Sequence, residues 1–227
     1  MTGVRLEGLR SAQELAEAAR SACYGWLAQA FAFPTPELTA AVASGRIREE
    51  LDSAAADLPF PVAAGDEMAA DPSATHEEMQ EAYIRLFEVG PGHPPCPLYE
   101  GSHRRGRPKI MEELVRFYEH FGLRHQEGDL PDHVCAELEF MHYLAFKQAA
   151  ARRAGTDGEP YRLAQRDFLA RHLNRWLPKL RARMEQLDPP PFYLSLARLA
   201  EEVCHRDFRF LEGGGVKPDT LLRSLPD

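Results

Sequence analysis

The chain has 227 residues and a formal net charge of −8, from 35 acidic side chains and 27 lysines and arginines. This length favours one domain with a core large enough to need no disulfides or structural metals. The negative charge argues against non-specific binding to nucleic acid, which depends on cationic side chains that neutralise phosphates.

The cysteines and the hydropathy pattern indicate a cellular compartment. The four cysteines are far apart in the sequence and form no CxxC pair, so they predict neither a zinc site nor a disulfide framework. The first thirty residues lack the basic start, apolar run and cleavage site of a signal peptide. No stretch approaches 18 consecutive apolar residues, so we expect no membrane insertion. These features predict a soluble cytoplasmic protein. We also expect it to be a monomer.

Apolar residues recur with helical spacing along nearly the whole chain, and the alternation typical of strands is almost absent. We therefore expect an all-α fold, a single-domain bundle of about seven to nine helices over residues 1–227. The predicted helices span residues 11–31, 36–45, 46–56, 75–87, 109–121, 132–153, 160–186 and 191–208.

Several helix boundaries have recognisable signals. Thr35 followed by Pro36 combines an N-cap hydroxyl with proline at the first helical position. Thr75 and Glu78 have the spacing of a capping box. Pro178 is expected to kink or break the helix over residues 160–186, because proline removes a backbone hydrogen bond and clashes with the preceding turn.

Three segments lack helical periodicity. Residues 57–74 are rich in Ala, Pro, Gly and Asp and predict a surface loop, and residues 211–227 predict a tail. Residues 88–108 contain five prolines and end in a basic cluster, "HRRGRPK" (103–109), which we assign to a solvated loop. A loop of this length inside a compact domain is usually functional or mobile.

The stretch "LPDHVCAELEFMHYLAF" (130–146) is an apolar helix that carries ionisable side chains. On a helical wheel, His133 and Glu137 fall inside the apolar arc, beside Phe140 and Leu144. Asp132 is expected to be the N-cap. A carboxylate on an apolar face is costly unless it is paired. Glu137 therefore either forms a buried pair, with His133 or with an arginine, or lines an open groove for a ligand that is partly cationic and partly apolar.

An alternative function rests on two ExxH patterns, Glu139 with His142 and Glu202 with His205. Two such patterns on separate helices, each joined by a further glutamate, form the di-iron site of some helical bundles. The alternative is thus a di-iron oxidase or oxygenase. No GxSxG, GxGxxG or P-loop pattern supports other chemistry.

Four segments of the chain form a recognisable set: "EAYIRLF" (81–87), Pro131-Asp132-His133 followed by Glu137, and the stretches "CYGWLAQAF" and "HLNRWLPKL". In these segments the chain resembles the TorD/DmsD/NarJ family of maturation chaperones for molybdenum oxidoreductases. These segments follow the family's order from about residue 20 to residue 208.

The resemblance implies an all-α protein without catalytic activity and without a cofactor of its own. Its expected partner is the apo-form of a molybdenum oxidoreductase catalytic subunit, bound through a twin-arginine leader and held back from premature export. A carboxylate accepts an arginine through two parallel hydrogen bonds. We therefore expect carboxylates to receive the two arginines and apolar residues to receive the rest of the leader. The predicted leader-binding residues are Tyr83, Leu86, Phe87, Glu100, Asp132, His133, Glu137, Phe140 and Leu144.

Overall fold

The computed structural model describes residues 12–62, 75–124, 130–187 and 189–213. Within these ranges the chain forms ten α-helices, nine of them with eight or more residues, and one π-helical turn. The predicted all-α fold is confirmed, whereas the assignment of all 227 residues to one domain stays a prediction. The elements are α1 (Ala12–Ala30), α2 (Pro36–Ala43), α3 (Arg46–Ala56), α4 (His76–Tyr83), η2 (Ile84–Glu88), α5 (Glu100–His103), α6 (Arg107–His120), α7 (Val134–Arg153), α8 (Glu159–Arg171), α9 (Leu173–Met184) and α10 (Pro191–Glu212).

The predicted N-caps are correct. The Thr35 hydroxyl accepts a hydrogen bond from the Leu38 N–H at 3.2 Å, and Pro36 begins α2. Thr75 and Glu78 form the reciprocal capping box at the start of α4. After Tyr83 this helix continues as the π-helical turn η2, a feature that often marks functional positions.

Three predicted boundaries were wrong. The helix predicted over residues 160–186 is interrupted at His172, where φ is −119° and ψ is −95°, while Pro178 lies inside α9. Residues 88–108 are not a continuous loop, because they contain α5 and the start of α6. The tail predicted from residue 211 begins later, since α10 extends to Glu212. Residues 63–74 of the predicted loop and 214–227 of the tail lie outside the described residues.

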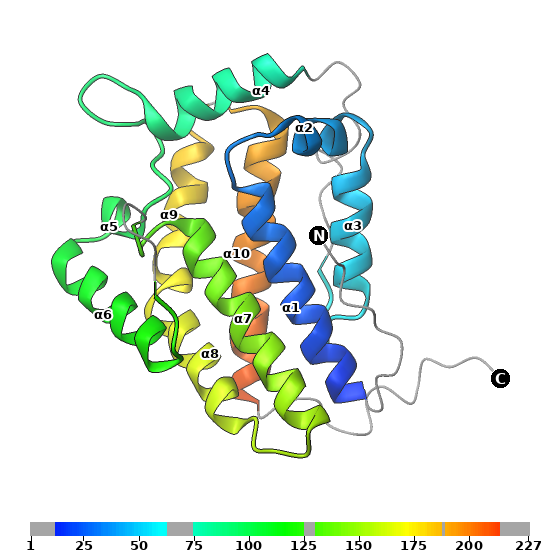
Figure 1. Cartoon of the computed structure of the whole chain (residues 1–227). Coiled ribbons are helices and arrows are strands. Elements are labelled where there is room, and N and C mark those ends of the chain that lie inside the picture. Colours follow the sequence, from blue (N-terminus) through cyan, green and yellow to red (C-terminus); the bar gives the residue numbers. More distant parts are fainter. Residues whose placement is uncertain (1–11, 63–74, 125–129, 188, 214–227) are drawn as a thin grey trace.

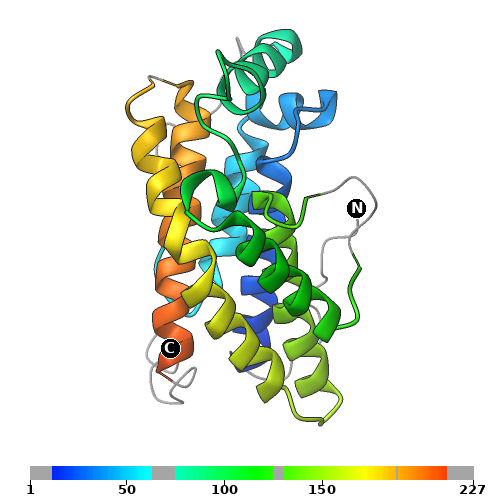
Figure 2. The ribbon, with the colours of Figure 1, turned by 90° about the vertical axis from the view of Figure 1, so that its left-hand side faces the viewer.

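The long helices α1, α7, α9 and α10 run side by side, and α1 packs along α7 (Figure 1). The helices α2 and α4 cover one end of this bundle, and α5 and α6 lie against its side, over α8 and α9 (Figures 1 and 2). Apolar side chains from α1, α2, α4, α6, α7, α8, α9 and α10 form one buried cluster. No helix within the described ranges has both the length and the apolar character needed to cross a bilayer.

A buried polar cluster ties α1 to α8 and α10. Arg20 donates from Nε to Asp207 Oδ1 at 2.5 Å and from Nη2 to Gln165 at 2.5 Å, and Tyr24 donates to Asp207 at 2.8 Å. The Arg20 and Asp207 side chains have no exposed surface. The ion pair therefore joins α1 to α10, and the hydrogen bond to Gln165 joins α1 to α8.

Candidate functional site

The site begins with two backbone segments that lie antiparallel to each other. The Val134 N–H donates to the Leu98 carbonyl and the Glu100 N–H donates to the Asp132 carbonyl, each at 2.8 Å. Tyr99 and His133 form the bridge between these bonds. This pairing brings Glu100, at the start of α5, beside Asp132, just before α7.

Asp132 is fully buried and holds the start of α6. Its Oδ2 accepts from the Gly101 N–H and from Arg107 Nε, both at 3.1 Å, and its Oδ1 accepts from Arg107 Nη2 at 3.3 Å. The expected N-cap role of Asp132 is therefore wrong. His133 is the N-cap of α7, because its Nδ1 accepts from the Cys135 N–H at 3.2 Å.

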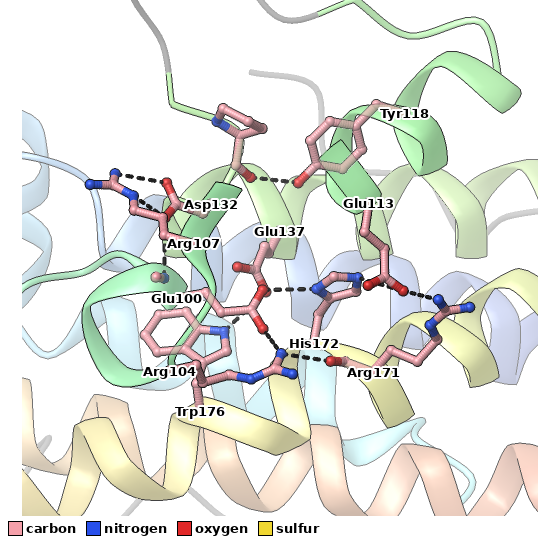
Figure 3. A network of polar contacts seen from close by, with 12 residues as sticks. Glu100, Arg104, Arg107, Glu113, Tyr118, Asp132, Glu137, Arg171, His172 and Trp176 are labelled. Atoms are coloured by element: carbon pink, nitrogen blue, oxygen red, sulfur yellow. Dashed lines mark hydrogen bonds and ion pairs between the residues drawn. The ribbon is translucent and has the colours of Figure 1, made fainter. Parts of the chain in front are cut away.

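Glu100 is also fully buried and lies between a guanidinium and an imidazole. It forms an ion pair with Arg104, one turn further along the chain. Its Oε2 lies 2.8 Å from His172 Nδ1, at the break between α8 and α9. Since an ionised carboxylate can only accept, the His172 Nδ1 carries the hydrogen of this bond. Figure 3 shows these contacts converging from α5, α7, α8 and α9.

Glu137 lies next to Glu100 and has no exposed surface. Its Oε2 accepts from Trp176 Nε1 at 3.1 Å, and no described side chain or backbone group bonds its Oε1. Burial, with the neighbouring charge of Glu100, raises the pKa of Glu137 well above its usual value. Glu137 is thus paired as one interpretation expected, but with Trp176 instead of His133 or an arginine.

The polar network extends outward to a surface cleft. His172 Nε2 faces Glu113 Oε1 at 4.0 Å, and Glu113 pairs with Arg171. Glu113 and Arg171 lie in the wall of an open cleft of about 610 Å³ between α6 and α8. The apolar part of its wall consists of Phe117, Phe121, Pro160, Leu163 and Ala164, and the charged or polar part of Lys109, Glu112, Glu113, Arg116, His120, Asp167 and Arg171.

The structure places the predicted apolar contacts in the core. Their side chains are at most 3% exposed and pack against other aromatic and aliphatic residues. The open groove that we expected along the apolar face of α7 is therefore absent from the described surface, because neighbouring helices cover this face. Leader contact by these residues stays a prediction, and it would require the helices to move apart. The residues concerned are Tyr83, Leu86, Phe87, Phe140 and Leu144.

Sequence reasoning missed four members of the network. Arg104 and Arg107 lie in a segment that the sequence predicts to be a solvated loop, and no sequence pattern predicts a binding role for His172 or Trp176. The spacing of Glu100 and Arg104 was an available signal, since opposite charges four residues apart are neighbours on a helix. No local signal could have paired Trp176 with Glu137, which is 39 residues away.

The two ExxH patterns do not form a common site. His142 bonds Ser21 on α1, whereas Glu202 pairs with Arg206 and His205 is exposed on α10. Among the described residues, no group of three His, Cys, Asp or Glu side chains is placed to hold a metal ion. The di-iron alternative therefore receives no support.

The fold and the site define an all-α bundle in which two neighbouring buried carboxylates, Asp132 and Glu100, each pair with a guanidinium group. The chain belongs to the nitrate reductase delta subunit family, whose pattern matches residues 42–182. This confirms the resemblance seen in the sequence.

Curated relatives agree with this family, and a solved structure shares the fold. The chain is 48% identical over 122 residues to the selenate reductase assembly chaperone protein of Thauera selenatis. The matched region is 52% of this chain and 63% of that protein. It is 37% identical over 192 residues to the perchlorate reductase assembly chaperone protein of Dechloromonas aromatica, over 81% of this chain and 85% of the relative. A redox enzyme maturation protein from Archaeoglobus fulgidus has the same fold, with a TM-score of 0.50 and 16% identity, over 89% of this chain and 99% of that one.

Proposed function

We propose that this protein is a cytoplasmic assembly chaperone for a molybdenum-containing reductase and has no catalytic activity of its own. It binds the twin-arginine leader of the apo catalytic subunit, helps cofactor insertion, and delays export until assembly is complete. Family membership supports the general role, and so do the names of the two relatives.

The observation that carries leader binding is the pair of buried carboxylates, Asp132 and Glu100, each in contact with a guanidinium. Their backbones are hydrogen-bonded to each other, so the two acceptors lie at neighbouring positions. Asp132 accepts two parallel N–H groups, the geometry in which carboxylates distinguish arginine from lysine. Two adjacent client arginines would fit two such acceptors.

The cleft between α6 and α8 is proposed to receive the apolar stretch that follows the arginines. Its wall is linked to Glu100, because Arg104 donates to the Arg171 carbonyl at 2.8 Å and His172 lies between Glu100 and Glu113. Phe117, Leu163 and Ala164 give its wall an accessible apolar surface. An amphipathic helix laid in a groove of this kind is a common mode of peptide recognition.

The experiment is a calorimetric titration of the purified protein with synthetic peptides. One peptide carries two adjacent arginines followed by an apolar helical stretch, and its matched control carries two lysines. We expect the lysine peptide to bind about tenfold more weakly or worse, because an ammonium cannot form the parallel pair of bonds. Equal affinity for both peptides would contradict recognition by carboxylate and guanidinium.

A further inference from the structure

The guanidinium partners of Asp132 and Glu100 come from one short segment of the same chain. Arg104 follows the last residue of α5, and Arg107 is the first residue of α6. Both carboxylate side chains have no exposed surface, whereas the Arg104 side chain is 24% exposed and the Arg107 side chain 44%. In each ion pair, the guanidinium is therefore the outer member and the carboxylate the inner one.

Gly101 makes room for the Arg107 side chain over Asp132. A methyl group at position 101 would lie 2.3 Å from Arg107 Cγ and 2.9 Å from Asp132 Oδ2. Any larger residue would push Arg107 off the carboxylate. The Arg107 guanidinium also lies over the Tyr99 ring, 5.7 Å from its centroid. Arg107 is thus seated in a closely fitted place, and Figure 3 shows it against Asp132.

We propose that Arg104 and Arg107 occupy, in the free protein, the places that the paired arginines of the client take on binding. This inference rests on the proposed function and adds a way in which leader binding is regulated. The segment 104–107 acts as an internal competitor, and a leader binds by exchanging its guanidiniums for those of the chain.

The exchange has a physical reason. Leaving a buried carboxylate without its cation is strongly unfavourable. Asp132 and Glu100 without arginine partners would therefore destabilise the free chaperone. Internal arginines keep both carboxylates paired before binding, and client arginines keep them paired afterwards. The apparent affinity for a leader equals the intrinsic affinity multiplied by the fraction of molecules whose internal arginines are displaced, so a small displaced fraction weakens binding. A peptide without two guanidiniums cannot make this exchange, which adds discrimination against other partners.

The first test compares the binding of the two-arginine peptide to wild type, Arg107→Gln and a matched control, Arg209→Gln. Arg209 is an exposed arginine that pairs with Glu212 near the end of α10, away from the carboxylate pair. We expect Arg107→Gln to bind about tenfold more tightly than wild type, because the competitor is gone. Arg209→Gln should bind like wild type.

The outcomes separate this inference from the proposed function. If wild type prefers the arginine peptide to the lysine peptide but Arg107→Gln binds no more tightly, the exchange is wrong and leader recognition stands. If neither protein distinguishes the two peptides, the proposed function falls, and the exchange falls with it.

A second measurement uses only the wild-type protein, in case Arg107→Gln is unstable. In a spectrum of arginine Nε–Hε groups, the Arg107 signal should be displaced by its bond to Asp132. Saturation with the arginine peptide should move this signal to the position of a solvated arginine, and the lysine peptide should leave it in place. A signal that stays unchanged in the saturated complex would overturn the exchange.

Discussion

The indole N–H of Trp176 donates to Glu137 at 3.1 Å, and neither side chain has any exposed surface. Burial raises the pKa of Glu137 in the folded protein well above its usual value. The folded protein therefore binds more protons than the unfolded chain at pH values between the two pKa values of Glu137. The contribution of Glu137 to the free energy of unfolding is therefore lost as the pH rises from its pKa in the unfolded chain to its pKa in the folded protein.

Glu137→Gln should remove this pH dependence. Glutamine has nearly the same shape, keeps an oxygen for Trp176 and cannot ionise. As the pH rises from about 4.5, the stability of the variant relative to wild type should increase by up to about 1.4 kcal/mol per pH unit. Urea unfolding at several pH values measures the difference. A difference that is constant between pH 5 and pH 8 would contradict a buried, neutral Glu137.

Asp207→Asn should strongly destabilise the fold. The substitution leaves the Arg20 guanidinium buried without its counter-charge, and breaking such a pair costs about 3–5 kcal/mol. Urea denaturation should show the loss as a lower midpoint with an unchanged slope. Glu212→Gln, which breaks the exposed pair with Arg209, is the matched control and should leave the midpoint nearly unchanged. A similar small change in both variants would rule out a dominant role for the buried pair.

Gly101→Ala tests the seating of Arg107. The added methyl group would meet Arg107 Cγ at 2.3 Å, so the arginine must leave Asp132. We expect a loss of about 1–3 kcal/mol in the free energy of unfolding. A double-mutant cycle with Arg107→Met provides the control. If Gly101 acts through Arg107, the two losses should not add, and additive losses would mean that the methyl group clashes elsewhere.

Leu163→Glu tests the cleft between α6 and α8. Leu163 is half-buried in the wall of the cleft, so a carboxylate there should oppose an apolar peptide segment. We expect affinity for the arginine peptide to fall about tenfold, with little change in melting temperature. Leu187→Glu, at an exposed leucine after α9, should bind like wild type. Unchanged affinity in Leu163→Glu would contradict binding of the apolar stretch in this cleft and would favour contact with the buried residues around Phe140.

The sequence predicted the helices well where the signals are local. The hydroxyls of Thr35 and Thr75 form the expected caps, because a cap depends on residues only three positions apart. Local signals were misleading where several residues compete. Asp132 has the sequence position of an N-cap, but its carboxylate bonds Gly101 and Arg107, and the neighbouring His133 caps α7. Likewise, Pro178 suggested a helix break that occurs at His172.

The sequence alone determined that this chain forms an all-α fold of the TorD/DmsD/NarJ type, and that acidic side chains lie within an apolar helix. Periodicity and capping are encoded within one or two helical turns, which explains why they could be recognised. Only the tertiary structure decided which group each carboxylate meets. Trp176 reaches Glu137 from another helix, and Arg107 reaches Asp132 across a separation of 25 residues. Such pairings depend on how distant segments pack, because no local spacing specifies them.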